Sequence, residues 1–342
     1  MSKNEYLNLL KKKLEFADDE FVDSLIADFE AHFEAGTSEG LSEAEIISHL
    51  GDIDEIVESL DVDHLTKQKR EKTVKSGDGK VNHVVVDGKF ADVTLVPSLN
   101  GKVEVNMINK GGLLSKFTNT MIGEQKGDVF EIRVLPLFNV SSDVDMKISV
   151  TLPDSLLSCK VMTTSGDIDY SKITFDGECI IKTASGDVSV SDCNQKSYDF
   201  QMASGDLKFN RSSGDIRVKT ASGDVMIKEG RGVLLACTLA SGDLMADGVF
   251  DKVDIKAVSG EVNLELSDAT NLSISSVNGD GNIRLKNMDS IRFNVSSVSG
   301  YCKIIEPAGE HKLKNRQELI LKEGVIPCKV STVDSKIVIN MG

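Results

Sequence analysis

The residues with the clearest potential for chemistry are carboxylates that follow a repeated Ser-Gly step. The tripeptide Ser-Gly-Asp, with degenerate copies toward the C-terminus, places glycines at Gly166, Gly186, Gly205, Gly214, Gly223, Gly242, Gly260, Gly279 and Gly300. The acidic residues that follow these glycines are Asp167, Asp187, Asp206, Asp215, Asp224, Asp243, Glu261 and Asp280. If the repeats stack at the strand spacing, the side chains form a column of like charges about 5 Å apart. Such a column needs a compensating partner.

Two kinds of partner can compensate the column. One is calcium, which β-rolls bind with short repeats of the type G-G-x-G-x-D. Only Gly205, Gly214 and Gly223 keep the required nine-residue step, which makes Asp206, Asp215 and Asp224 the calcium candidates. The other is a set of hydrogen bonds from turn amides and neighbouring hydroxyls. Because most of the repeat lacks the calcium spacing, we expect the hydrogen-bonded arrangement, with no metal and no cofactor.

No pattern typical of an enzyme accompanies the repeat. The five histidines form no H-x-H or H-E-x-x-H arrangement, and the chain contains neither a G-x-S-x-G elbow nor a P-loop. The six cysteines are scattered without a C-x-x-C pair, so we expect buried, reduced thiols. The sequence therefore predicts a protein without catalytic residues. The alternatives are a carbohydrate-active β-helix enzyme that uses a carboxylate cluster, and a calcium-binding β-roll.

The spacing of the repeat predicts how the chain is built around it. Successive glycines lie 20, 19, 9, 9, 19, 18, 19 and 21 residues apart, so the unit is about nineteen residues with a half-length step at Gly214. Apolar residues alternate before each Ser and resume two residues after each Gly, as in Val161 and Ile168. This pattern is typical of a strand that bends once at the glycine and keeps its apolar face inward on both sides of the bend. It indicates a mainly β fold, a β-solenoid of the β-helix or β-roll kind with Ser-Gly-Asp turns. A hairpin-based sandwich is the second possibility.

Residues 1–65 have a different period and predict a small all-α domain. Apolar residues recur at helical spacing in four segments, for example Leu25, Phe29 and Phe33 in the second. Ser42 and Glu45 have the spacing of a capping box that opens the third. Residues 66–80 are basic and almost without apolar side chains, which is typical of a linker. Alternating strands begin at Val81, so the β-solenoid repeat domain is expected over 81–342.

Charge separates the two domains and limits the partners. Residues 1–65 carry a net charge of −14 of the total of −15, which argues against nucleic acid. An ordinary solvated helical surface explains this charge most simply, and a protein or cationic peptide is the partner that it leaves open for the helical domain. The chain's own basic linker is the competing partner. No stretch approaches 18 consecutive apolar residues, so no transmembrane helix is expected. The start shows no apolar signal region, which favours the cytoplasm over the cell envelope or surface.

The motifs resemble two bacterial families. The chain from Val81 onward resembles the putative-adhesin domain family, through the segment Ile148-Ser149-Val150-Thr151-Leu152-Pro153 and the repeat that begins Thr164-Ser165-Gly166-Asp167-Ile168. Residues 1–65 resemble the HAAS-type helical domain of envelope and signalling proteins, through Asp28-Phe29-Glu30-Ala31-His32-Phe33 and Ser42-Glu43-Ala44-Glu45-Ile46-Ile47. The combination is similar to the LiaX-type envelope-stress family. The resemblance implies a β-solenoid without established enzymatic activity that associates with envelope components.

Overall fold

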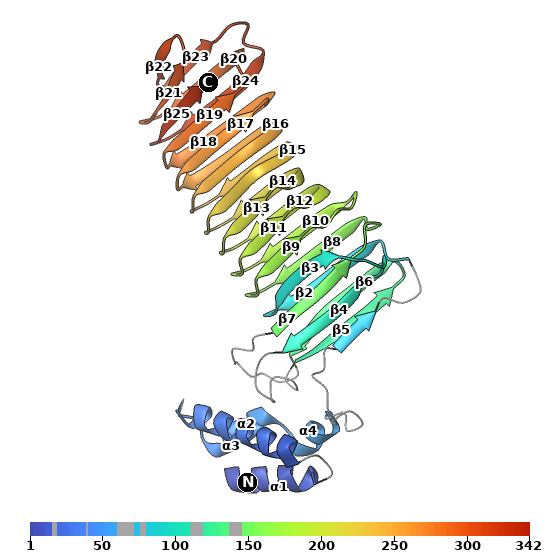
Figure 1. Cartoon of the computed structure of the whole chain (residues 1–342). Helices are drawn as coiled ribbons and strands as arrows, with labels where there is room; N and C mark the ends of the chain where they lie inside the picture. The colour runs from blue at the N-terminus through green and yellow to red at the C-terminus, as the bar shows by residue number, and fades with distance from the viewer. Residues whose placement is uncertain (16–18, 39, 60–71, 76–79, 110–118, 137–145) are drawn as a thin grey trace.

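The computed structural model describes residues 1–15, 19–38, 40–59, 72–75, 80–109, 119–136 and 146–342. Helices occupy the N-terminal part of the chain, and strands make up nearly all of the ordered structure from residue 72 onward (Figure 1). The predicted basic linker, 66–80, lies outside the described residues except for 72–75 and Lys80. Within it, β1 (Lys72–Lys75) pairs antiparallel with β4 (Glu104–Asn109).

The helical part has the elements expected from its apolar periodicity. They are α1 (Lys3–Lys13), α2 (Asp19–Ser38), α3 (Glu43–Leu50) and α4 (Ile53–Ser59). The predicted capping box is confirmed, because Ser42 Oγ accepts the Glu45 amide and Glu45 accepts the Ser42 amide. Tyr6, Phe29 and Phe33 form the buried aromatic centre. Leu9, one of the apolar residues that recur at helical spacing in the first segment, is 41% exposed and does not join this core.

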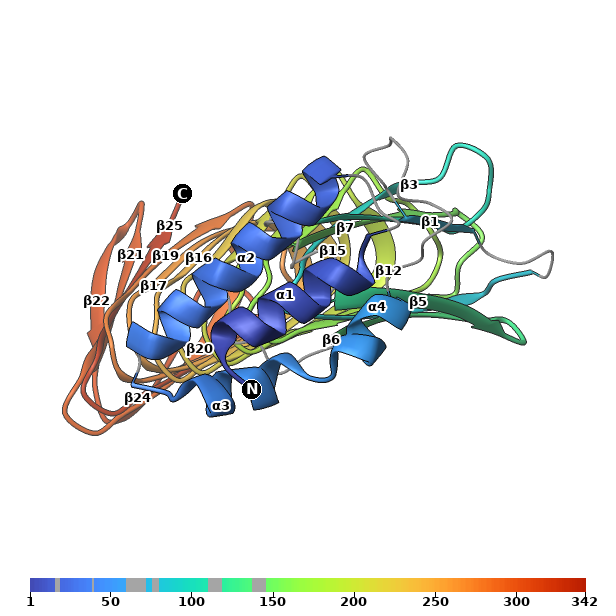
Figure 2. The same cartoon turned by 90° about the horizontal axis from the view of Figure 1, so that it is seen from below.

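The repeat folds into parallel coils stacked along one axis, shown from the side in Figure 1 and from below in Figure 2. Strands pair with their counterparts one coil away, in register, as for Cys159↔Cys179↔Tyr198. This parallel pairing confirms the stacked-coil arrangement over the hairpin sandwich for the repeat region. The strands are β8 (Ser158–Thr163), β9 (Ile168–Ser171), β10 (Glu178–Thr183), β11 (Val188–Ser191), β12 (Asn194–Met202), β13 (Leu207–Asn210), β14 (Ser213–Thr220), β15 (Val225–Leu239), β16 (Leu244–Ser259), β17 (Val262–Ser267), β18 (Asn271–Asn278) and β19 (Gly281–Lys286).

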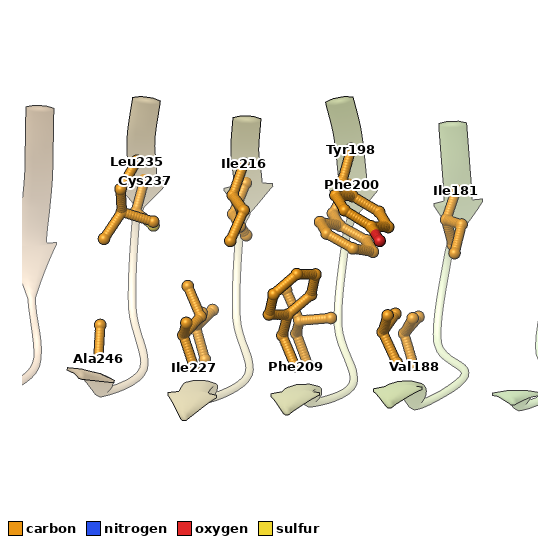
Figure 3. Packing of buried hydrophobic residues seen from close by; sticks show 14 of the residues in the cluster. Ile181, Val188, Tyr198, Phe200, Phe209, Ile216, Ile227, Leu235, Cys237 and Ala246 are labelled. Atoms are coloured by element: carbon orange, nitrogen blue, oxygen red, sulfur yellow. The ribbon is translucent and has the colours of Figure 1, made fainter. Parts of the chain in front are cut away.

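The inward side chains fill the space between the two long sides of each coil. Figure 3 shows aliphatic side chains from facing strands meeting in the interior, with one aromatic layer among them. In that layer Tyr198 stacks on Phe200 and meets Phe209 edge-on, with centroids 5.9 and 5.0 Å apart. The predicted alternation is therefore confirmed: buried and outward residues alternate along the repeat strands, as in β8 and β10.

The N-terminal end of the solenoid does not follow chain order. Its strands are β2 (His83–Lys89), β3 (Asp92–Pro97), β4, β5 (Asn119–Lys126), β6 (Val129–Pro136) and β7 (Met146–Leu152). The first coil, β2 and β3, lies between the coil made by β8 and β9 and the later pair β6 and β7. β4 and β5 pair antiparallel outside β7 and β6 and cover that end.

The C-terminal end has the same exchange of order. Its strands are β20 (Ile291–Ser297), β21 (Tyr301–Glu306), β22 (Gly309–Leu313), β23 (Arg316–Ile320), β24 (Ile326–Thr332) and β25 (Lys336–Met341). β24 and β25 insert between the coil β18–β19 and the coil β20–β21. Antiparallel β22 and β23 cover the end. Gly300 therefore packs on Ser335 O and not on the preceding repeat glycine, Gly279, so the last repeat does not stack directly on the others, although its spacing predicts that it should.

Candidate interaction surfaces

The repeat glycines from Gly166 to Gly279, except Gly214, lie one above the other at the corner between the two strands of each coil. A Cβ at Gly186 would lie 2.1 Å from Gly166 O, and one at Gly223 would lie 2.1 Å from Gly205 O. Neither separation is sterically possible, and Gly223 also has φ +119°. The backbones of successive coils therefore touch at this corner, and only glycine permits the contact.

The carboxylates beside these glycines form one row. Each Oδ1 accepts the backbone N–H of the acidic residue one coil further on: Asp187 N to Asp167 Oδ1 is 2.9 Å, and the bonds at Asp206, Asp224 and Asp243 are 2.8 Å. Glu261 N continues the series with a bond to Asp243. Backbone amides thus compensate the like charges in part, in agreement with the hydrogen-bonded interpretation.

Asp215 and Gly214 are not part of this row, which corrects the predicted column. Gly214 belongs to β14, where its Cβ would lie 2.4 Å from Gln195 O, and Asp215 Oδ1 accepts the amides of Val233 and Leu234. The nine-residue step is half a coil, so it places Asp215 at the end of β14 away from the Gly223 corner. The calcium candidates Asp206 and Asp224 are neighbours, and Asp215 lies apart from them. Among the described residues no three His, Cys, Asp or Glu side chains are placed to hold a metal ion.

The row also contains a residue that the repeat pattern missed. Asp167 N donates to Asp92 Oδ1 at 3.1 Å, and Lys147 Nζ lies 3.4 Å from Asp92 Oδ2. In this coil Phe90-Ala91-Asp92 stands where the other coils have Ser-Gly-Asp. The sequence therefore marks the corner only by an acidic residue that is followed by an apolar one. We call the complete set the carboxylate row: Asp92, Asp167, Asp187, Asp206, Asp224, Asp243, Glu261 and Asp280. Beyond it, Lys336 N donates to Asp280 Oδ1.

A second row, of alternating sign, lies at the other end of the short strands β9, β11, β13 and the start of β15. We call it the alternating row: Lys172, Asp192, Arg211 and Glu229, all with positive φ. Arg211 binds Asp192 through two hydrogen bonds of 2.8 and 3.0 Å. This bond, more than the charge of Lys172, keeps the pKa of Asp192 below its usual range. Sequence reasoning missed this row, because left-handed positions are normally marked by Gly or Asn.

The cysteines are buried, as predicted. All six are free thiols in the solenoid interior. Burial raises the pKa of Cys159, Cys237 and Cys302 to about 12, and that of Cys193 to about 11. Because the thiolate is the reactive form, these residues are unreactive at neutral pH.

In the helical part, the lysines and most of the acidic residues lie on different helices. All of its lysines lie on α1, whereas α2, α3 and α4 contain no Lys or Arg. Lys11 pairs with Asp23 at 3.0 Å and Lys13 pairs with Asp54. These two ion pairs neutralise part of the positive charge of α1. The exposed side of α2 carries Glu30 and Glu34. This helix therefore presents a negative surface to solvent.

A groove of about 400 Å³ opens beside α1, at the end of α3 and the start of α4. Met1, Leu9, Ile47 and Ile53 contribute its apolar lining, and Asp52 and Asp54 its carboxylates. Met1 and Leu9 are 61% and 41% exposed. Lys13, which pairs with Asp54, also lines the groove, so the helical part combines a negative surface with an accessible groove of mixed apolar and charged lining. None of the helices among the described residues has the length and apolar composition needed to cross a bilayer.

Comparison with solved structures finds similar chains at low identity. A putative adhesin from Parabacteroides distasonis has a TM-score of 0.40 and 16% identity, over 80% of this chain and 97% of that one. A putative adhesin from Bacteroides fragilis has a TM-score of 0.34 and 15% identity, over 80% and 98%. A putative lipid-binding protein from P. distasonis has a TM-score of 0.34 and 16% identity, over 79% and 96%.

Comparison with sequence families is more specific. No curated protein matches the chain. The HAAS profile matches residues 5–59, which include all of α2 and α3. The Toastrack DUF4097 profile matches residues 81–339, from the first coil to the last strand. The chain therefore belongs to the Toastrack DUF4097 family.

Proposed function

We propose that the chain is a non-catalytic interaction protein associated with the bacterial cell envelope. The solenoid serves as a rigid scaffold, and the acidic helical domain, residues 1–65, docks a cationic segment of a protein or a cationic peptide. The observation that carries the proposal is the separation of charge in the helical part: lysines lie only on α1, and two of them are paired with acidic residues. Helices α2, α3 and α4 carry carboxylates with no Lys or Arg among them.

The negative surface of α2, α3 and α4 affects both the rate and the salt dependence of binding. A dense negative field raises the encounter rate with cationic partners, and the effect weakens with salt because the Debye length falls from about 10 Å at 0.1 M to about 3 Å at 1 M. The apolar side chains of the groove, among them Met1 and Leu9, add a contact that salt does not screen. A partner with both cationic and apolar residues fits this combination.

Two competing interpretations bear on the proposal. The basic segment 66–80 can bind the helical domain within the same chain, which would lower the affinity for an added partner. A carbohydrate-active enzyme is not favoured, since carboxylates of the row are engaged as acceptors of backbone amides from the next coil.

Binding of a fluorescent cationic amphipathic peptide to the intact chain tests the proposal. Glu30→Gln with Glu34→Gln should weaken binding severalfold at 0.05 M salt and have little effect at 1 M. The matched control is Asp169→Asn with Asp176→Asn, which removes two exposed carboxylates from the solenoid and should leave binding unchanged. Equal losses in both variants, or binding indifferent to salt, would contradict the proposal.

A further inference from the structure

A Ser–His–Asp arrangement lies at the N-terminal end of the solenoid, apart from the surfaces described above. His83 begins β2, Ser158 begins β8, and Asp128 lies in the turn between β5 and β6. β2 pairs in parallel with β8 on one side and β6 on the other, so His83 lies opposite Ser158 and opposite Val129, the neighbour of Asp128. The exchanged order of the strands thus brings His83 next to Ser158, 75 positions further along the sequence, and next to the turn that contains Asp128.

The distances define the role of each side chain. His83 Nδ1 lies 2.7 Å from Ser158 Oγ, which is a short hydrogen bond, and His83 Nε2 lies 3.8 Å from Asp128 Oδ2. Asn82 Nδ2 donates to Asp128 Oδ2 at 3.0 Å and keeps the pKa of Asp128 below its usual range. The Asp128 carboxylate is therefore an anion at neutral pH. In the tautomer that carries the proton on Nε2, the side nearer this carboxylate, the Nδ1 lone pair faces the Ser158 hydroxyl and accepts its proton.

We infer that Ser158 is an activated nucleophile, with His83 as its base, that accepts an acyl group from an activated ester. A nucleophile in hydrogen-bond contact with a base, itself oriented by a third group, is the arrangement that activates a serine. Ser158 Oγ forms a bond to the carbonyl carbon and its proton passes to His83 Nδ1. The ester C–O bond breaks, the leaving oxygen takes that proton, and His83 returns to its neutral form.

The surroundings favour a single acylation over turnover. The side chains of His83 and Asp128 are 37% and 52% exposed, so a reagent can reach them from solvent. The amides of Leu157 and Ser158 both donate to Asn82 O, at 2.8 and 3.3 Å, and are not free to bind an oxyanion. Without that stabilisation both acylation and hydrolysis of the acyl-serine are slow, so acylation needs an activated ester and the acyl-serine, which is an ordinary ester, persists. Ser158 is thus a modification site on a scaffold, which goes beyond the proposed function and does not depend on it.

The test uses the intact chain and p-nitrophenyl acetate at neutral pH. We expect release of about one equivalent of p-nitrophenolate, and peptide mass spectrometry should place the acetyl group on Ser158. Ser158→Ala should abolish the modification at this position. His83→Gln, with an unchanged unfolding temperature, should slow it by about 10²-fold, the lower end of general-base assistance. Asp128→Asn should slow it less.

The matched control is Ser197, which lies on the same outward row of strands two coils further along. Ser197→Ala should leave the rate and the amount of acetylation unchanged. Acetylation of Ser158 no faster than that of Ser197 would overturn the inference. So would a rate in His83→Gln equal to that of the unaltered chain, because the imidazole would then be a structural partner of the hydroxyl only.

Discussion

The carboxylate row and the alternating row accommodate stacked charged residues in different ways. Both stack charged residues coil upon coil at the edges of the short strands. In the carboxylate row all charges have one sign, the backbones touch through glycine, and the carboxylates from Asp92 to Asp243 each accept an amide from the next coil. In the alternating row charges of opposite sign follow one another, Arg211 binds Asp192 through its side chain, and non-glycine residues adopt positive φ. The first row depends on backbone geometry, and the second on the order of its charges and on this ion pair.

The largest effect is expected where the backbone contact is broken. Gly223→Ala would place a Cβ 2.1 Å from Gly205 O, at φ +119°. Strain and forced separation of the coils should lower the free energy of unfolding of the solenoid by roughly 3 kcal/mol or more. Chemical denaturation followed by far-UV circular dichroism measures this change.

The control for Gly223→Ala is Gly127→Ala. Gly127 has φ +63° and open space around its Cβ position, so only the backbone conformation is strained. This variant should lose about 1 kcal/mol. Equal losses in the two variants would mean that contact between coils contributes nothing at the Gly223 corner.

A smaller effect is expected from the alternating row. Arg211→Glu removes the two hydrogen bonds to Asp192, and the introduced carboxylate would lie between Asp192 and Glu229, so that three like charges follow one another. The denaturation midpoint should fall, by less than in Gly223→Ala because both partners of the ion pair are about half exposed. Lys219→Glu, an exposed charge reversal on β14, is the control and should change the midpoint little.

The pH dependence identifies the cause of that loss. The pKa of Asp192 is lowered in the folded chain, so its stabilising contribution is present above its ordinary value of 3.8 and is lost as the pH falls through the lowered value. The gap between the unaltered chain and Arg211→Glu should therefore be full at neutral pH and shrink below pH 3.8. A gap that stays constant down to about pH 2 would assign the effect to packing.

Removing one charge from the carboxylate row should raise the denaturation midpoint, whereas removing a charge from the alternating row should lower it. Asp206→Asn keeps an Oδ1 that can accept the Asp224 amide, now 2.8 Å away, and removes a like charge between Asp187 and Asp224. The midpoint should rise slightly at low salt, and the gain should vanish near 1 M salt. Asp192→Asn in the alternating row should lower it under the same conditions. A fall in both variants would mean that repulsion along the carboxylate row is negligible.

The weakest expected effect is that of calcium. Because Asp215 lies apart from Asp206 and Asp224, we expect no stoichiometric binding tighter than about 10⁻⁴ M by titration calorimetry. Micromolar sites that disappear when Asp206, Asp215 and Asp224 are changed to Ala would reverse the assignment of the carboxylate row to backbone hydrogen bonding.

The alternation of apolar and polar residues is sufficient to predict the structure of one coil, but it does not predict the order in which the coils stack. Alternation around residues such as Val188 and Val190 predicts which side chains are buried, because a strand turns successive residues to opposite faces. The insertion of β24 and β25 could not be predicted, since both β18 and β20 offer similar parallel partners. The same limit hid Asp92, whose coil lacks Ser-Gly, and the contact of His83 with Ser158, which depends on strand order.

The central claim is that the helical domain, and not the carboxylate row, receives a cationic partner. Hydrogen-exchange mass spectrometry of the intact chain, with and without a saturating cationic amphipathic peptide, tests it most directly. The account predicts slower exchange in peptides from α2, α3 and α4, and unchanged exchange in peptides that contain Asp187, Asp206 and Asp224. Protection confined to the peptides of the carboxylate row would contradict the account.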